Sequence, residues 1–431
     1  MSTQKKQWAA IIIMIALFAM IAFVTNLCSP MAIIVKNDFG ASNLLAQIGN
    51  YGNFIAYLVM GIPAGMLIAK FGYKKTALIG LFVGICGILI QWLSGHVGKE
   101  SAFLVYLIGA FVSGFTMCIL NCVVNPMLNL LGGGGNKGNQ LIQLGGVFNS
   151  TAAVCVYIIM GALIGDAAKA HIADATPALM IALAIFVVAF IIISFTKIEE
   201  PEQAPVNVGL IKGACSYRHF VLGILAIFLY MGIEVGVPTY VMQYLSTAKD
   251  AATPGLGMDA GIVGLIVAVY WFMMLIGRLV GASIGGKVSS RVLITTVSLA
   301  CIALVLFGIF APETSLVSVP GVDWANLELI WAEVPVGIFA FILVGLCTSV
   351  MWGGIFNMAV EGLGKYTAIA SGIFMTMVFG CAVMVAIEAA VADAFGSFTA
   401  SYWVILGCAA YILFYALIGS RPSKKALNNK E

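Results

Sequence analysis

Long apolar stretches alternate with short polar segments from one end of the chain to the other. A helix that crosses the hydrocarbon core of a bilayer needs about 20 predominantly apolar residues. The stretches lack the strict alternation of barrel strands, so we expect helices. They lie near 8–34, 46–69, 76–95, 102–130, 140–165, 177–196, 220–245, 261–285, 292–311, 335–360, 368–392 and 399–419. The pattern therefore predicts an all-α membrane protein with twelve transmembrane helices.

The longest polar stretch inside the chain, residues 197–219, falls between the sixth and seventh predicted spans. We therefore expect an N-terminal six-helix half (1–196), a cytoplasmic linker (197–219) and a C-terminal six-helix half (220–431). A faint repeat supports the two halves, because Gly65–Lys75 and Gly281–Arg291 close the second and eighth spans with small residues and a basic turn. Repeats of this kind build transporters whose solute site lies between the halves, near the middle of the membrane.

Composition narrows the class further, since 62% of the 431 residues are apolar and only 9% are charged. A soluble domain carries about 25% charged residues, so this chain has too few charges to cover a water-exposed surface. The apolar run that starts at Trp8 is too long for a signal peptide, and we expect it to stay as the first transmembrane helix. The net charge of +3 is too small to indicate nucleic-acid binding.

The basic residues separate by side when the N-terminus is placed in the cytoplasm. Of the 21 lysines and arginines, four fall in outer loops, Arg278 lies inside a span and the other 16 face the cytoplasm. The four outer residues are Lys36, Lys99, Lys169 and Lys249. Cytoplasmic loops of membrane proteins are enriched in Lys and Arg. The sequence thus predicts a multi-pass protein of the bacterial inner (cytoplasmic) membrane, with both termini cytoplasmic.

The sequence offers little for catalysis or for a cofactor. Its ten cysteines are scattered singly through apolar runs, which is typical of small packing residues. The three histidines fall in loops, and the run Gly132–Gly135 lacks the Lys-Ser or Lys-Thr ending of a phosphate-binding loop. We therefore expect neither an enzyme nor an ATP-driven pump, and no metal or other cofactor.

Polar side chains inside the predicted spans are the main candidates for function, because burying them in hydrocarbon is costly unless they face a cavity or one another. Asn121, Asn125 and Asn129 recur at every fourth position and so share one helical face. Asn50 and Asn53 share a face of the second span in the same way. Neutral donors and acceptors of this kind match the hydroxyl groups of a sugar, and hydrogen bonding between helices is the alternative interpretation.

Aromatic side chains of the later spans offer flat apolar faces to a sugar ring, although packing is the more common role of an aromatic residue in a span. The Tyr270-Trp271 pair near Arg278 is the strongest of these. The predicted substrate-binding residues are Asn26, Ser29, Asn50, Asn121, Asn125, Gln143, Asn149, Tyr230, Tyr270, Trp271, Trp352 and Asn357.

Three charged residues fall within predicted spans. Glu234 lies in the middle of the seventh span, and a carboxyl group at such a position is a candidate for taking up and releasing a proton. The alternative is a structural ion pair, with Arg278 as a possible partner; Arg278 could also bind an anionic substrate or extend toward the cytoplasm. We interpret Glu388, near the outer end of the eleventh span, as exposed in a vestibule.

The basic turn Lys70-Phe-Gly-Tyr-Lys-Lys75, five residues after Gly65, resembles the signature loop of the major facilitator superfamily, with Ala69 in place of its usual acidic residue. Within that superfamily the chain resembles the fucose:proton symporter family, which includes glucose/galactose transporters. The matching segments occur in order along the chain: Gly61-Ile-Pro-Ala-Gly65, Asn125-Pro126, Phe148-Asn149-Ser150, Tyr230-Met-Gly-Ile-Glu234, Tyr270-Trp271, Gly277-Arg278 and Ile355-Phe356.

The resemblance implies a twelve-helix fold and proton-coupled sugar uptake, with Asn26 and Asn149 at positions of sugar-site residues. It also reveals departures, because Ser29 and Asn121 stand where the fucose symporter carries acidic residues. Glu234 matches a glutamate of the glucose/galactose members, which makes it the leading candidate for proton coupling.

The residues and the resemblance together predict a secondary transporter that imports a monosaccharide or a small sugar derivative by proton symport with alternating access. The expected partners are the sugar, protons and membrane lipid, without nucleic acid, and the expected state is a monomer. Two alternatives stay open: transport of an anionic sugar such as a sialic or uronic acid, with Arg278 as its counter-charge, and a membrane sugar sensor that transports nothing. The coupling ion is open between a proton, sodium and none.

Overall fold

The computed structural model describes residues 8–39, 43–164, 175–196, 198, 200, 209–250, 253–258, 260–323 and 328–422. Within these ranges it describes all side chains except those of 28–39, 43–51, 99–100, 157–164, 260–261 and 322–323. The side chains of Ser29 and Asn50, two of the predicted substrate-binding residues, therefore lie outside the described part of the chain.

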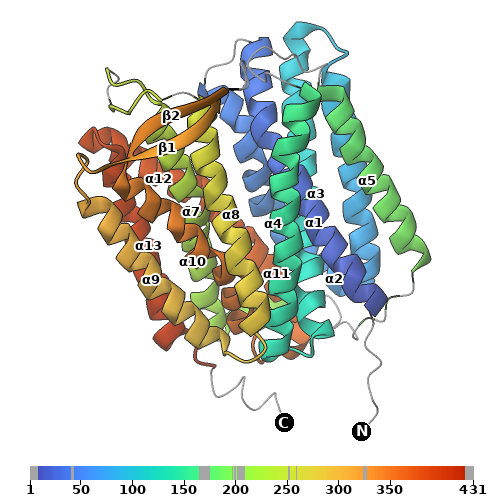
Figure 1. The fold of residues 1–431 in the computed structure, drawn as a ribbon. Coiled ribbons are helices and arrows are strands. Elements are labelled where there is room, and N and C mark those ends of the chain that lie inside the picture. Colours follow the sequence, from blue (N-terminus) through green and yellow to red (C-terminus); the bar gives the residue numbers. More distant parts are fainter. Residues whose placement is uncertain are drawn as a thin grey trace. The chain divides into compact units, whose positions relative to one another are not determined.

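The helices form two compact units (Figure 1). The first unit comprises Met1–Phe220, Val360–Phe379 and Pro422–Glu431, and the second comprises Val221–Ala359 and Gly380–Arg421. Residues 360–379 thus belong to the compact unit that contains the N-terminal helices. The sequence-based division into 1–196, 197–219 and 220–431 stays a prediction.

The first unit is built from helices packed side by side. Helix α1 packs against α4, and α2 packs against α3 (Figure 1). Its helices are α1 (Trp8–Phe39), α2 (Asn43–Ser94), α3 (Lys99–Leu131), α4 (Gly135–Ile164), α5 (Thr176–Phe195), α6 (Gly209–Cys215), η2 (Gly364–Tyr366), α11 (Thr367–Thr376) and η3 (Met377–Phe379).

Helix α2 consists of two helices that meet at Gly72, where the backbone takes φ 81° and ψ 174°. This left-handed value of φ is readily available only to glycine. The carboxylate of Glu200 accepts hydrogen bonds from the backbone N–H groups of Tyr73 (2.6 Å) and Lys74 (2.8 Å), which begin the second helix. The Lys74 ammonium in turn donates to the carbonyl oxygens of Ser194 (3.0 Å) and Thr196 (2.8 Å) at the end of α5.

Helix α11 approaches α2 so closely that their backbones touch at glycines. A Cβ atom at Gly61 would collide with the backbone and side chain of Thr376, and one at Gly372 would lie 2.5 Å from the Gly61 carbonyl oxygen. Gly65 faces Gly372 and the carbonyl oxygen of Ala368 in the same way. Small residues at a helix contact allow this approach within membranes.

The predicted linker contains a short helix that the sequence pattern did not indicate. The ring of Tyr366 fills the space beside Gly213 of α6. The Tyr217 ring lies 6.0 Å from the Tyr366 ring, and Nε2 of His219 donates to the carbonyl oxygen of Glu361 at 2.8 Å. These contacts hold residues 209–219 to the segment that precedes α11.

The second unit has its own bundle, in which α10 packs against α8 and α9, and α9 packs against α13 (Figure 1). Most of α7 (Arg218–Ser246) lies in it. Its other helices are α8 (Ala260–Ile284), α9 (Ser290–Phe310), α10 (Val336–Ala359), α12 (Gly380–Phe395), η4 (Phe398–Ser401), α13 (Tyr402–Phe414) and the π-helical turn η5 (Tyr415–Gly419).

A β-hairpin lies between the predicted spans 292–311 and 335–360, where the apolar pattern indicated no regular element. Strands β1 (Leu316–Asp323) and β2 (Glu328–Pro335) pair antiparallel, with Leu316 opposite Pro335 and Asp323 opposite Glu328. The two strands are shorter than a transmembrane span and lie outside the long apolar runs, so the apolar pattern gives no signal for them. Trp331, on β2, is 66% exposed.

Ten described helical stretches are long and apolar enough to cross a membrane. One of them, Gly52–Ser94, has 43 residues and contains the break at Gly72, so its length serves two crossings. Helix α4, with 30 residues, is also long enough. Counting α2 as two crossings and adding α4 gives twelve.

The described surface is apolar where that of a soluble protein is polar. Ile12, Phe82, Leu104 and Val188 are all more than half exposed, whereas Asn125 is completely buried. This distribution suits a helix bundle whose surroundings are lipid, because lipid solvates apolar side chains and leaves polar groups to find partners inside the protein.

Candidate functional site

A cluster of amide and hydroxyl groups lies inside the first unit, where α2 meets α3. Nδ2 of Asn121 donates to the Tyr57 hydroxyl at 2.9 Å. One turn further along α3, Nδ2 of Asn125 donates to the backbone oxygen of Asn121 at 3.0 Å. Asn121 and Asn125 are buried, with 7% and 0% exposure. We call Tyr57, Asn121 and Asn125 the Asn121 cluster. The predicted polar face of α3 therefore contacts α2, through the hydrogen bond between Asn121 and Tyr57.

The two asparagines at sugar-site positions of the resembled family have backbone partners. Nδ2 of Asn149, on α4, donates to the carbonyl oxygen of Phe18 on α1 at 2.8 Å. Nδ2 of Asn26 donates to the carbonyl oxygen of Ala22 in its own helix, also at 2.8 Å. Both residues are half-buried. Gln143, on α4, is buried.

The second unit brings the two charged candidates together. Nη2 of Arg278, on α8, lies 3.6 Å from Oε1 of Glu234, on α7. The side chains are only 10% and 13% exposed, respectively. Ionisable residues within transmembrane helices usually pair with one another in this manner. Arg278 therefore balances the charge of Glu234 in this arrangement.

Tyr270 connects the same two helices to α10. Its hydroxyl lies 3.1 Å from the backbone oxygen of Glu234, to which it donates, and 3.2 Å from Oγ1 of Thr348. Gly345 makes room for Tyr270, because a Cβ atom at Gly345 would collide with the Tyr270 carbonyl oxygen. The close approach of α8 and α10 thus fixes the tyrosine beside the ion pair.

Aromatic rings complete this region. The Tyr230 ring lies one turn before Glu234 on α7, with its centroid 6.2 Å from that of Trp352 on α10. Trp271 meets Tyr270 edge-on, with the centroids 5.4 Å apart. We call the set formed by Tyr230, Glu234, Tyr270, Arg278 and Thr348 the Glu234 cluster.

Asn357 lies apart from this cluster. Its Nδ2 donates to Oγ of Ser290 at 2.9 Å, which fixes the end of α10 to the start of α9. Nine residues separate Asn357 from Thr348 on the same helix, a rise of about 14 Å. A single small solute in contact with the Glu234 cluster would not reach it.

The structure also revises two interpretations of single residues. Glu388 is completely buried on α12, so the prediction that it is exposed in a vestibule is wrong. The sequence could not show this, because the glycines that face Glu388 belong to another helix. Thr348 was not predicted as a functional residue; its only sequence signal was a hydroxyl in the middle of an apolar span.

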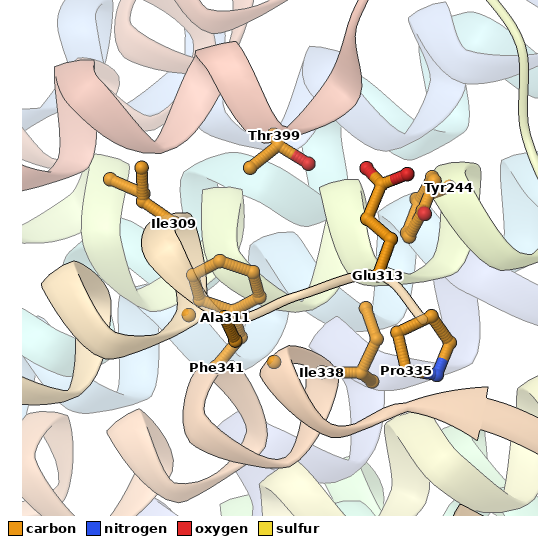
Figure 2. Close-up of a pocket in the computed structure, with 10 residues that line it drawn as sticks. Tyr244, Ile309, Ala311, Glu313, Pro335, Ile338, Phe341 and Thr399 are labelled. Atoms are coloured by element: carbon orange, nitrogen blue, oxygen red, sulfur yellow. The ribbon is translucent and has the colours of Figure 1, made fainter. Parts of the chain in front are cut away.

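A small cavity of about 30 Å³ lies in the second unit, between α7, α9, α10 and η4 (Figure 2). Its lining includes Tyr244, Glu313, Phe341 and Thr399. This volume accommodates one or two water molecules at most. The cavity contains no predicted substrate-binding residue, so we assign no solute to it.

The family model of the Major Facilitator Superfamily matches residues 13–379, and the chain belongs to this superfamily. Among curated proteins, it is 29% identical to a glucose/galactose transporter of Brucella abortus over 97% of this chain and 96% of that protein. It is 22% identical to the L-fucose-proton symporter of Escherichia coli, over 95% and 92%.

The fold matches solved transporters of the superfamily. The crystal structure of the superfamily transporter FucP in the outward conformation aligns with a TM-score of 0.78 and 21% identity, covering 95% of this chain and 98% of that one. The predicted twelve-helix fold is thus confirmed, and the chain is a multi-pass membrane transporter rather than an enzyme.

Proposed function

We propose that this transporter imports a monosaccharide or a small sugar derivative by proton symport with alternating access. The observation that carries the proposal is the buried Glu234–Arg278 pair inside the membrane-spanning helices, in a chain whose full-length relatives are named as sugar transporters and a sugar-proton symporter. Such relatives indicate the cargo, and the intramembrane carboxyl group offers a place for the proton.

Glu234 is the proposed proton-coupling residue. When its carboxylate takes up a proton, the negative charge that balances Arg278 disappears and the attraction between α7 and α8 falls. The Tyr270 hydroxyl holds the backbone of Glu234, so a change at this side chain is passed to α8 and α10. Release of the proton restores the ion pair. The protonation state of one carboxyl group would in this way favour one helix arrangement over another.

The sugar-binding role is proposed for the neutral polar and aromatic residues. In the first unit these are the Asn121 cluster with Asn26, Gln143 and Asn149; in the second they are Tyr230, Tyr270, Trp271 and Trp352. Amides hydrogen-bond to sugar hydroxyls as both donor and acceptor, and aromatic rings cover the apolar face of a sugar ring. Asn357, which was also predicted to bind substrate, is a weaker candidate because its Nδ2 already donates to Ser290.

The proposed location is the bacterial inner membrane, with both termini in the cytoplasm. The separation of lysines and arginines supports this orientation, and the two relatives named above come from bacteria. The monomeric state stays a prediction.

The test uses purified protein in proteoliposomes with an imposed pH gradient and a panel of radiolabelled monosaccharides. We expect the wild-type protein to accumulate one of them against its concentration gradient. Glu234→Gln should lose this accumulation but retain exchange of sugar across the membrane, because exchange needs no net proton movement. Glu333→Gln, the same change at an exposed residue of β2, should accumulate sugar as the wild type does. Undiminished accumulation by Glu234→Gln would exclude Glu234 from the coupling.

An anionic sugar is the less favoured cargo. Its carboxylate would need Arg278, whose charge is already balanced by Glu234 at 3.6 Å. Competition between a neutral sugar and a sialic or uronic acid separates the two, since inhibition by the acid and not by the neutral sugar would reverse our assignment.

A further inference from the structure

The second unit encloses another carboxyl group that has no role in the function proposed above. Glu388, on α12, has 0% exposure. Both of its carboxyl oxygens are buried, and neither has a hydrogen-bond partner among the described residues. Most buried polar groups in proteins are hydrogen-bonded, so a membrane-embedded carboxyl without a partner needs an explanation.

Two glycines of α7 make the space that the carboxyl group of Glu388 occupies. A Cβ atom at Gly236 would collide with both oxygens of Glu388, and one at Gly232 would lie 3.6 Å from Oε1. The two glycines are four residues apart and therefore lie on one face of α7. Glu234, between them in sequence, points to a different face, toward Arg278. The carboxyl groups of Glu234 and Glu388 thus lie on opposite sides of α7.

The groups around Glu388 do not stabilise a negative charge. The Tyr240 hydroxyl, on α7, donates to the carbonyl oxygen of Val385 at 2.8 Å. The Tyr402 hydroxyl, on α13, donates to the carbonyl oxygen of Val237 at 3.2 Å. Among the described residues, the other titratable neighbours are two thiols, Cys381 on α12 and Cys408 on α13. Neither tyrosine proton is free for the carboxylate, and no lysine or arginine is among these neighbours.

The cost of burial distinguishes the two forms of the group. An ionised carboxylate removed from water without a partner costs several kcal/mol or more, even after relaxation of the protein. A neutral carboxyl group that lacks partners loses only its hydrogen bonds to water, about 1–3 kcal/mol. The neutral form of Glu388 is therefore favoured in this buried position. Its ionisation requires an arrangement in which water or a hydrogen-bond donor reaches the carboxyl oxygens.

We propose that Glu388 is a second proton-binding site, neutral when α7 and α12 are packed as they are here and ionised when their separation admits water. The proton leaves the carboxyl oxygen for water in that open arrangement and returns from water before the helices close again. A contribution of this proton to sugar import rests on the function proposed above, whereas its binding and exchange do not.

The first experiment needs no sugar. Infrared spectra of the purified protein are recorded at a pH at which exposed carboxyl groups are ionised. We expect a C=O stretching band of a neutral carboxyl group, and we expect Glu388→Gln to remove it. Asp393→Asn, on the exposed end of the same helix, should leave the band unchanged. In deuterium oxide the band should shift as O–H becomes O–D, because the proposed site opens to water.

The outcomes separate the possibilities. A band that persists in Glu388→Gln, or that never shifts in deuterium oxide, would overturn the proposal, since the group would be ionised or permanently sealed. If Glu388→Gln does not fold, Gly236→Ala keeps the carboxyl group and should change the band frequency by pressing on its oxygens; an unchanged band would count against the assignment.

A second experiment measures protons moved per sugar in proteoliposomes. Loss of one of two proton sites should lower this ratio about twofold in Glu388→Gln. An unchanged ratio would restrict Glu388 to proton exchange without coupling and would overturn its place in transport. If the wild-type protein moves no sugar at all, the proposed function fails, while the infrared result still decides the proton site.

Discussion

Replacing Glu200 with alanine removes the only described side chain that bonds to the backbone N–H groups at the start of the second helix of α2. The carboxylate accepts from Tyr73 at 2.6 Å and from Lys74 at 2.8 Å. Backbone N–H groups in the first turn of a helix have no partner within the helix, and a negative charge there also interacts favourably with the helix dipole. The Glu200 side chain therefore acts as a cap supplied from a distant part of the sequence.

The size of the effect follows from these two contacts. Loss of a side-chain cap costs about 0.5–2 kcal/mol, and hydrogen bonds to a charged group contribute about 1.5–3 kcal/mol each when well buried. Glu200 is only part-buried, so water replaces some of the loss, and the two bonds together contribute less than the sum of two well-buried ones. We expect about 2 kcal/mol, which makes local opening of this turn about 30-fold more frequent.

Hydrogen–deuterium exchange of the purified protein, followed by mass spectrometry, measures this opening directly. Peptides that contain residues 73–76 should exchange about 30-fold faster in Glu200→Ala. Lys75→Met serves as the control, because it removes a charge from the exposed side of the same turn. Equal exchange in Glu200→Ala and the wild-type protein would refute the capping argument.

Three further predictions concern packing, hydrogen bonding and orientation. Gly61→Ala forces α2 and α11 apart and should lower stability by about 1–3 kcal/mol in denaturant unfolding, whereas Gly52→Ala, with nothing within 4 Å, should not; equal losses would contradict the contact. Tyr270→Phe should cost only about 0.6 kcal/mol in the same assay, as interhelical hydrogen bonds in membranes do on average; a loss several times larger would show a further role for the hydroxyl. Partial desolvation raises the pKa of the Cys215 thiol, although the residue is exposed. Its labelling by a membrane-impermeant maleimide should therefore be slower at neutral pH than that of a free thiol and should accelerate as the pH rises. The orientation is tested with a variant whose sole cysteine is Cys215. If the maleimide labels this variant only when added from the periplasmic side, the proposed orientation is wrong.

The fold could be predicted because a membrane imposes a simple requirement on each span. Apolar runs of sufficient length, broken by basic turns, gave the number of crossings, and the turn at Gly72 lies where the sequence separates the second and third spans. The hairpin was missed for the same reason, because Leu316–Asp323 is too short and too mixed in composition to resemble a span.

The candidate site could be predicted only in part. Periodicity placed Asn121 and Asn125 on one face, and the scarcity of intramembrane charges made Glu234 and Arg278 candidates for a pair. Partners on other helices gave no such signal. The contact of Tyr57 with Asn121 joins residues 64 positions apart, and the burial of Glu388 depends on glycines of α7. A single sequence shows which residues share one face of a helix, but it does not show which other helix packs against that face.

The docking of residues 209–219 beside Tyr366 has a consequence for a chain cut by a protease. Glu200 is bonded to Tyr73 and Lys74, and α6 rests against Tyr366, so both sides of a cut made between positions 201 and 208 stay attached to the first unit. On the C-terminal side of the cut, the chain passes from the first unit into the second within α7, which continues unbroken from Arg218 to Ser246. Nicked protein should therefore purify as one particle until a denaturant separates its two fragments.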